Sequence, residues 1–322
     1  MYNQKLLTSS HAPFWHNGSS ITAKSYNIML ATLPAVVMGI YQYGVPALAV
    51  LALSVSCAMI WEFLINTAMK RPTTISDGNA AVIGLLLGML LPATAPWWAV
   101  VVGTFVAIIV GKQIYGGIGC NPFNPSLVAI AILMLSWKSL FNFDGALVNY
   151  DFGFHILYPL AALKHFGPSV TENYSLIGLL MGQQVGATGA TFGLGLIIGG
   201  LYLILRGHIR WEISISFLVG IFVTALLFNI ADPDKYAGPF FHLFTGYTLI
   251  AAFFLLPEDS SSPVNFIAML IYGVMAGVLT ILIRNIGFFP DGVVLAILML
   301  NIANPLLDKI RPKALGKGIE HA

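Results

Sequence analysis

The chain has 322 residues, of which 57% are hydrophobic and only 9% are charged, and its mean hydropathy is +0.84. Soluble domains carry roughly a quarter charged residues, so this composition excludes a soluble globular protein and predicts a polytopic membrane protein of the all-α class. The net charge of +2 is small and the basic residues are scattered along the chain, which excludes a nucleic-acid partner.

A polar N-terminal tail, residues 1–27, lacks the central apolar stretch of a cleavable signal. Apolar runs bounded by polar residues then predict ten membrane segments, at about 28–43, 46–66, 79–91, 96–111, 124–137, 192–205, 213–230, 240–256, 264–283 and 287–306. Several are shorter than the ~20 residues that a helix needs to cross a ~30 Å hydrocarbon core. We therefore expect some of them to be half-helices.

Two of the short runs occupy corresponding places in the two halves of the chain. One follows Asp77-Gly78 and stops at Pro92, and the other follows Thr245-Gly246 and stops at Pro257. Short segments interrupted by Gly or Pro in matching positions are typical of inverted repeats built around broken helices. We predict a first repeat at 28–137, an extracytoplasmic loop at 138–190, a second repeat at 191–307 and a C-terminal tail at 308–322.

The distribution of basic residues predicts the orientation. With both termini in the cytoplasm, only Lys138, Lys164, Lys235 and Arg284 of the 15 Lys and Arg residues lie outside. An excess of basic residues in cytoplasmic loops is the usual pattern of membrane proteins. This topology places Thr191 on the extracytoplasmic side.

The tetrad Thr188-Gly189-Ala190-Thr191, at the start of the sixth segment, looks like an acceptor for a covalently attached flavin. A threonine hydroxyl can form a phosphoester with FMN, and the neighbouring small residues would give a modifying enzyme access to an exposed Thr191 Oγ. Alternatively, the tetrad starts a helix whose small residues serve close helix packing. Short motifs of this kind need structural context.

Acidic residues beside the apolar runs allow two interpretations. Asp77 either caps the third segment, by accepting from backbone amides, or takes part in cation coupling. Glu258 and Asp259, after Pro257, are expected to form a solvated turn with the serines that follow.

Four further charged residues lie in or at the ends of apolar runs, where charges are costly. Lys112 and Arg284 end the fourth and ninth segments, and they either face a flavin or substrate phosphate or extend to the headgroup region. Glu62 and Glu212 belong either to an ion path or to a salt bridge with a neighbouring subunit.

Four features together carry a resemblance to a known family. They are the tetrad, the ten-segment pattern, the segment Arg71-Pro72-Thr73-Thr74-Ile75-Ser76-Asp77-Gly78 and the run Lys112-Gln113-Ile114-Tyr115-Gly116-Gly117-Ile118-Gly119-Cys120-Asn121-Pro122-Phe123-Asn124-Pro125. Nearly the whole chain resembles the family that contains the D subunit of the Rnf complex and the B subunit of the sodium-pumping NADH:quinone reductase. The compact N-terminal tail favours the Rnf branch. One position departs from the family's flavin-attachment pattern, which often has an acidic residue where this chain has Gln184.

The resemblance implies a fold similar to that of urea and ammonium channels and an FMN esterified to Thr191. It also implies a bacterial inner-membrane complex that passes electrons between ferredoxin and NAD and moves sodium ions or protons. Other subunits would supply the iron–sulfur centres, a further FMN and the NAD site, and a flavin transferase would attach the cofactor. The chain itself has no such motifs, so it has no complete activity alone.

A second, non-covalent flavin, riboflavin, is expected on family grounds. We predict that Gly117, Gly119, Asn121 and Asn124 line its site, although a tight turn that caps the fifth segment explains them as well. The alternative to a redox protein is a channel or transporter on the same scaffold, in which Thr191 stays unmodified.

Overall fold

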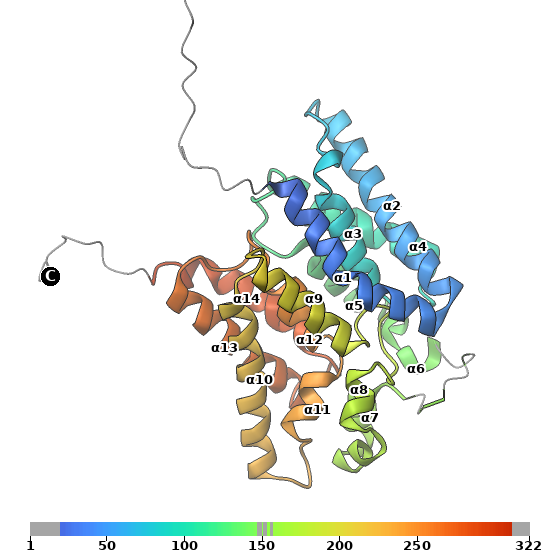
Figure 1. The fold of residues 1–322 in the computed structure, drawn as a ribbon, viewed down its shortest axis with the longest axis vertical. Helices are drawn as coiled ribbons and strands as arrows, with labels where there is room; N and C mark the ends of the chain where they lie inside the picture. Colours follow the sequence, from blue (N-terminus) through green and yellow to red (C-terminus); the bar gives the residue numbers. More distant parts are fainter. Residues whose placement is uncertain (1–19, 147–149, 151–152, 155–156, 311–322) are drawn as a thin grey trace, which may run out of the picture.

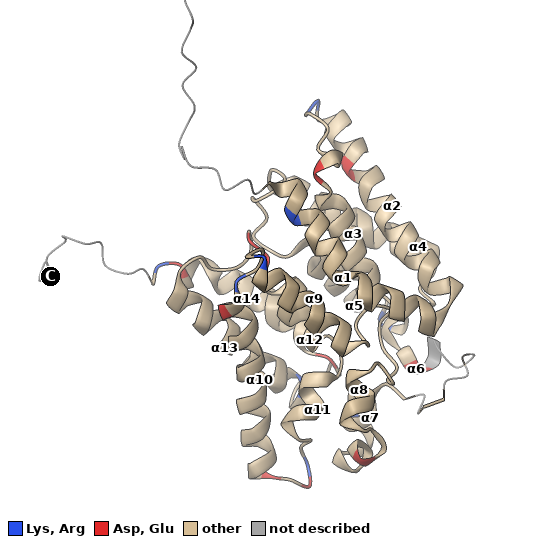
Figure 2. Cartoon of the chain, viewed as in Figure 1, with Lys and Arg blue, Asp and Glu red and all other residues tan. Residues whose placement is uncertain are grey.

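The computed structural model describes residues 20–146, 150, 153–154 and 157–310, and within these the chain forms helices and no strands. In the described part of the chain, five helices are long and apolar enough to cross a membrane: α1 (Ile21–Tyr43), α2 (Val45–Ala68), the helix Trp97–Tyr115, α10 (Trp211–Ala231) and α13 (Phe266–Asn285). The helix Trp97–Tyr115 comprises α4 (Trp97–Phe105), the π-helical stretch η2 (Val106–Val110) and the short η3 (Gln113–Tyr115). Charged residues lie mostly at helix ends and in connecting segments (Figure 2). The predicted all-α multi-pass membrane protein is confirmed.

The first helix is longer than its apolar run. It begins at Ile21, because the Ser20 hydroxyl accepts a hydrogen bond from the Ala23 amide and so caps the first turn. The helix thus starts seven residues before the apolar run at 28–43, and residues 1–19 of the predicted tail lie outside the described part. Gly44, with φ of +71°, separates α1 from α2.

Apolar helices of 10–17 residues supplement the long ones. They are α3 (Asn79–Leu90), α5 (Pro125–Ser136), α9 (Gly193–Leu205) and α14 (Val293–Leu307). In front of α3, the turn η1 (Ile75–Asp77) ends at Gly78, and Asp77 Oδ1 accepts from the Asn79 amide at 2.8 Å. Asp77 thus satisfies one backbone amide at the start of α3, as the capping interpretation predicts, while Gly78 holds the N-cap position itself.

The run 240–256 is a broken helix. It consists of α11 (Pro239–Phe244), a break at Thr245-Gly246, and then α12 (Thr248–Ile250) with the π-helical stretch η6 (Ala251–Leu255). Gly246 has φ of +67°, a conformation that favours glycine. The Tyr247 hydroxyl donates to the Leu90 carbonyl at 2.9 Å, so the start of α12 meets the end of α3.

Helices α1–α5 and α9–α14 form two groups that lie side by side (Figure 1). The first helix of one group packs on the first of the other, α1 on α9, and the last on the last, α5 on α14. The contact between α1 and α9 is close, because a Cβ on Gly199 would lie 2.0 Å from the Ala31 carbonyl oxygen. Within the second group, α10 packs tightly along α13.

The segment between the groups, predicted as a loop, contains short helices: η4 (Lys138–Phe141), α6 (Phe143–Ala146), α7 (Pro159–Phe166), η5 (Pro168–Asn173) and α8 (Leu176–Leu180). Its fold brings Tyr158 and α7 against the residues that precede α14.

Candidate functional site

The tetrad forms a turn that is fixed to the end of α3. The Thr188 amide and hydroxyl both donate to the Leu91 carbonyl, at 3.0 and 2.9 Å, and the Gly189 amide donates to the Met89 carbonyl at 2.9 Å. A Cβ on Gly189 would lie 2.5 Å from the Met89 side chain. Glycine is therefore required here for close approach.

Thr191 is only 3% exposed, so the expected exposure of its hydroxyl is wrong. Its Oγ1 lies 3.4 Å from Gln42 Oε1 at the end of α1, which covers it. Gln184 holds the same turn from inside, because its Nε2 lies within hydrogen-bond distance of the carbonyls of Leu179, Thr191 and Phe244. An ionised acidic side chain has no proton to donate to carbonyls, which explains the amide at this position.

A cavity of about 620 Å³ lies near the tetrad, between the 138–165 segment and the residues before α14. We call it the aromatic cavity, since its walls include Phe141, Phe143, Tyr158, Tyr247, Phe288 and Phe289. Lys138, Lys164 and His165 also line it. Tyr158 and Tyr247 contribute at the same time to a small void of about 10 Å³ that Thr191 lines. The two tyrosines thus separate Thr191 from the aromatic cavity.

A buried ion pair holds Tyr158 and Tyr247, which separate Thr191 from the aromatic cavity, in place. Arg284 Nη2 lies 3.0 Å from Asp291 Oδ1, and both side chains are at most 5% exposed. Asp291 Oδ2 accepts from the Tyr247 amide at 2.7 Å, and the Tyr158 hydroxyl lies 3.5 Å away. Arg284 is therefore bound inside the protein and does not extend to the headgroup region.

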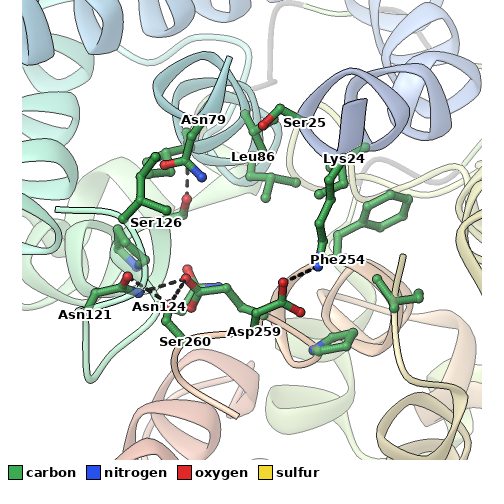
Figure 3. A pocket seen from close by; sticks show the side chains of 18 of the residues that line it. Lys24, Ser25, Asn79, Leu86, Asn121, Asn124, Ser126, Phe254, Asp259 and Ser260 are labelled. Atoms are coloured by element: carbon green, nitrogen blue, oxygen red, sulfur yellow. Dashed lines mark hydrogen bonds and ion pairs between the residues drawn. The ribbon is translucent and has the colours of Figure 1, made fainter. Parts of the chain in front are cut away.

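A second cavity, of about 290 Å³, lies between α1, α3, the start of α5 and the segment after η6 (Figure 3). We call it the polar cavity. Gly119, Asn121 and Asn124 line it as predicted, together with Asn79 and Ser126, whereas Gly117 is not among its walls. Asn124 has a structural task as well, since its Oδ1 caps α5 and its Nδ2 donates to the Leu255 carbonyl.

Glu258 is a wall residue of the polar cavity that the sequence interpretation missed. One of its carboxylate oxygens lies 2.7 Å from Asn121 Nδ2 and 2.9 Å from Ser260 Oγ, and the other lies 2.5 Å from Ser261 Oγ. Burial raises the pKa of Glu258, while these three donors act to lower it. The expected solvated turn is therefore wrong for Glu258 and correct for Asp259, whose side chain is 70% exposed and pairs with Lys24.

Lys112 and Glu62 form another buried ion pair, at 2.9 Å, with side chains at most 1% exposed. Glu62 also accepts from the Thr74 hydroxyl at 2.6 Å. The ion pair explains why both charged side chains lie inside the protein. Neither residue lines the aromatic or the polar cavity.

The helices define a multi-pass membrane protein, and the aromatic and the polar cavity lie at separate places in it. A model of the NQR2, RnfD, RnfE family matches residues 8–316. The chain therefore belongs to this family.

Named relatives are similar over nearly their whole length. The D subunit of the ion-translocating oxidoreductase complex of Colwellia psychrerythraea is 33% identical, with 95% of this chain and 96% of the relative covered. The D subunit of the Na(+)-translocating ferredoxin:NAD(+) oxidoreductase complex of Acetobacterium woodii is 35% identical, with 95% and 94% covered.

Proposed function

We propose that this protein is the flavin-carrying membrane subunit of an ion-translocating oxidoreductase complex, which passes electrons between ferredoxin and NAD and moves sodium ions or protons. Membership of the family and the names of the relatives support the complex. The tetrad Thr188–Thr191 is the observation that carries the flavin assignment.

The Thr191 hydroxyl is the proposed attachment point of FMN, through an ester to the flavin phosphate. Because Thr191 is buried against Gln42, attachment has to take place while this turn is away from the end of α1. Once bound, the flavin supplies chemistry that no side chain offers, since it accepts two electrons and releases them singly.

The aromatic cavity is the proposed place of the flavin ring. Aromatic walls suit a flat ring system, because rings pack in offset or edge-to-face arrangements. Its volume of about 620 Å³ falls in the range of small-molecule sites, ≈ 300–1,000 Å³. Tyr158 and Tyr247 would have to move for a ring tethered at Thr191 to enter, since both lie between the two spaces.

The polar cavity is the proposed place of a second, non-covalent flavin, riboflavin. Its amides and hydroxyls, on Asn79, Asn121, Asn124 and Ser126, are neutral hydrogen-bonding groups that match the hydroxyls of a ribityl chain.

We further propose ten segments in two inverted repeats, as in urea and ammonium channels. The packing of α1 on α9 and of α5 on α14 supports a two-fold relation. Residues from predicted cytoplasmic loops, such as Asn121 and Glu258, meet at the polar cavity, and residues from the predicted extracytoplasmic loop 138–190, such as Lys138 and Lys164, line the aromatic cavity. Both termini are then cytoplasmic, in a bacterial inner membrane, and Thr191 is extracytoplasmic.

Partners complete the reaction. Other membrane and soluble subunits would carry the iron–sulfur centres, a further FMN and the NAD site, and a flavin transferase would attach the FMN to Thr191. This subunit has no complete activity alone.

Fluorescence of the denatured polypeptide tests the attachment. Thr191→Val keeps the shape of the side chain but removes the hydroxyl, so we expect the yellow-green fluorescence of the band on a denaturing gel to disappear. Thr191→Ser keeps a hydroxyl and should retain fluorescence. Thr188→Val is the matched control, and it should stay fluorescent although its side chain loses the hydrogen bond to Leu91, at a cost of about 0.5–1.5 kcal/mol, since the Thr188 amide still donates to that carbonyl.

A wild-type chain without fluorescence, made in a host that has the flavin transferase, would support the alternative of a solute channel. Intact mass spectrometry gives an independent result, since an ester of FMN adds a defined mass to the chain and Thr191→Val should lack it.

A further inference from the structure

The polar cavity has acidic walls at one side. Glu258 and Asp259 both line it, and among the described residues that line it the basic one is Lys24. Lys24 already forms an ion pair with Asp259, and Figure 3 shows the two side chains pointing toward each other across the cavity rim. The charge of Glu258 is therefore not balanced by a basic group of the wall.

The hydrogen-bond partners of Glu258 favour its ionised form, whereas its burial raises its pKa. Asn121 Nδ2 can only donate, and the hydroxyls of Ser260 and Ser261 lie within 2.9 Å of its oxygens. Ionised carboxylates accept hydrogen bonds and do not donate them, and bonds to a charged acceptor are stronger than those to a neutral one. The cavity thus contains an anion stabilised by neutral donors.

Such a site distinguishes ligands by charge. A phosphate monoester carries about −1.5 to −2 charges at neutral pH, so the carboxylates of the wall repel it, more strongly at half-buried Glu258 than at Asp259, whose side chain is 70% exposed. A neutral ring with a hydroxyl-bearing chain meets no such repulsion, and Asn79, Asn124 and Ser126 offer it hydrogen-bonding groups.

We propose that Glu258 and Asp259 make the polar cavity selective for a non-phosphorylated flavin and exclude flavin phosphates. This inference rests on the proposed second flavin. The aromatic cavity has a mixed wall, since Lys138, Lys164 and His165 line it together with Asp144 and Asp291, and Asp291 is paired with Arg284. Its basic side chains can meet a phosphate, whereas in the described part of the chain the polar cavity offers only Lys24 for this.

A competition experiment with the purified full-length protein tests the selectivity. The protein is incubated with equal concentrations of riboflavin and FMN, free flavin is removed by gel filtration, and the protein is precipitated with acid. Only non-covalent flavin is released by this treatment, and chromatography then gives its composition. We expect the wild type to release at least ~10-fold more riboflavin than FMN, which corresponds to a repulsion of the phosphate of about 1.4 kcal/mol.

Two variants remove one negative charge each. Glu258→Gln keeps the shape of the side chain, and Asp259→Asn also frees the Lys24 ammonium to meet a phosphate. Both should move the ratio of released riboflavin to FMN toward one. Asp234→Asn, a single-charge change at a residue that does not line the polar cavity, is the matched control and should keep the wild-type ratio.

Size-exclusion chromatography shows whether each variant is folded. If Glu258→Gln does not fold, Asp259→Asn still decides, because its side chain is 70% exposed. Equal release of both flavins by the wild type, or an unchanged preference in the folded variants, would overturn the selectivity. A wild type that releases neither flavin would overturn the second flavin site itself, whereas gel fluorescence at Thr191 would be unaffected by that result.

Discussion

Lys112 and Glu62 show how a single pair of side chains can govern stability inside this protein. Each loses its hydration on folding, and among the described residues the partner and Thr74 provide the hydrogen bonds that replace it. Breaking a buried ion pair leaves an uncompensated charge, which costs about 3–5 kcal/mol, whereas removing both charges together is often tolerated.

A double-mutant cycle tests how strongly Glu62 and Lys112 depend on each other. Glu62→Gln and Lys112→Met should each lower the free energy of unfolding by about 3–5 kcal/mol, and the double variant should lose much less than the sum. Unfolding in detergent, followed by circular dichroism, measures the coupling.

The exposed pair Lys24–Asp259 is the control. Exposed salt bridges contribute about 0–1 kcal/mol, so its single variants should change unfolding little. Additive losses at Lys112 and Glu62 would contradict the internal pairing described above.

Asp77 allows a prediction that separates its cap from a role in cation coupling. Asparagine caps helices about as well as aspartate, so Asp77→Asn should keep the hydrogen bond to the Asn79 amide and leave unfolding nearly unchanged. Electron transfer and cation movement are then measured together in vesicles containing the complex. Lost cation movement with retained stability would assign Asp77 to coupling, and unchanged movement would leave it as a cap alone.

At the scale of elements, the break between α11 and α12 connects local backbone geometry to the ion pair of the second half. A Cβ on Gly246 would lie 2.3 Å from Asp291 Oδ2 and 3.1 Å from Arg284 Nη2, at a φ of +67°. One small residue therefore leaves room for the carboxylate that accepts from the Tyr247 amide.

Gly246→Ala should consequently destabilise the protein by more than ~2 kcal/mol. The cost of placing alanine in a left-handed backbone conformation and the cost of displacing a buried ion pair add to one another. Gly238→Ala is the matched control within the same region, since its Cβ would meet nothing within 4 Å. Thermal unfolding of the two purified variants makes the comparison. Similar midpoints for Gly246→Ala and the wild type would show that Gly246 is not needed to leave room for the Asp291 carboxylate.

The elements themselves were largely predictable from the sequence. Apolar runs bounded by Gly78, Pro92, Gly246 and Pro257 indicated the short helices, because these residues act locally. The start of α1 was misplaced, since the polar residues of its first turn carry no hydropathy signal, although Ser20 provides a cap.

The sequence predicted the structure less well where residues from distant parts of the chain meet. The burial of Thr191 depends on Gln42, and the hydrogen bonding of half-buried Glu258 depends on Asn121. These partners are 149 and 137 positions away in sequence. Local patterns could identify the hydroxyl and the carboxylate but not what covers them. The same holds for the aromatic cavity, whose walls come from separate segments.

At the scale of the whole molecule, the proposed orientation places Lys70 in the cytoplasm and Lys235 outside. Both residues are exposed, so cysteines introduced there, in a background with Cys57 and Cys120 replaced by serine, should report on sidedness. A membrane-impermeant maleimide applied to intact spheroplasts should label Lys235→Cys and leave Lys70→Cys unlabelled until the membrane is opened. Labelling of both sites in intact spheroplasts would rule out the odd number of crossings between them.

The bond between the Tyr247 hydroxyl and the Leu90 carbonyl joins the two interrupted helices between the aromatic and the polar cavity. Leu87, Leu90 and Ile250, which lie beside it on the same helices, have no exposed surface. These packed apolar side chains offer a hydrated ion no polar partner, so its entry between them would be costly. The layer that they form would thus act as an insulator between the two cavities.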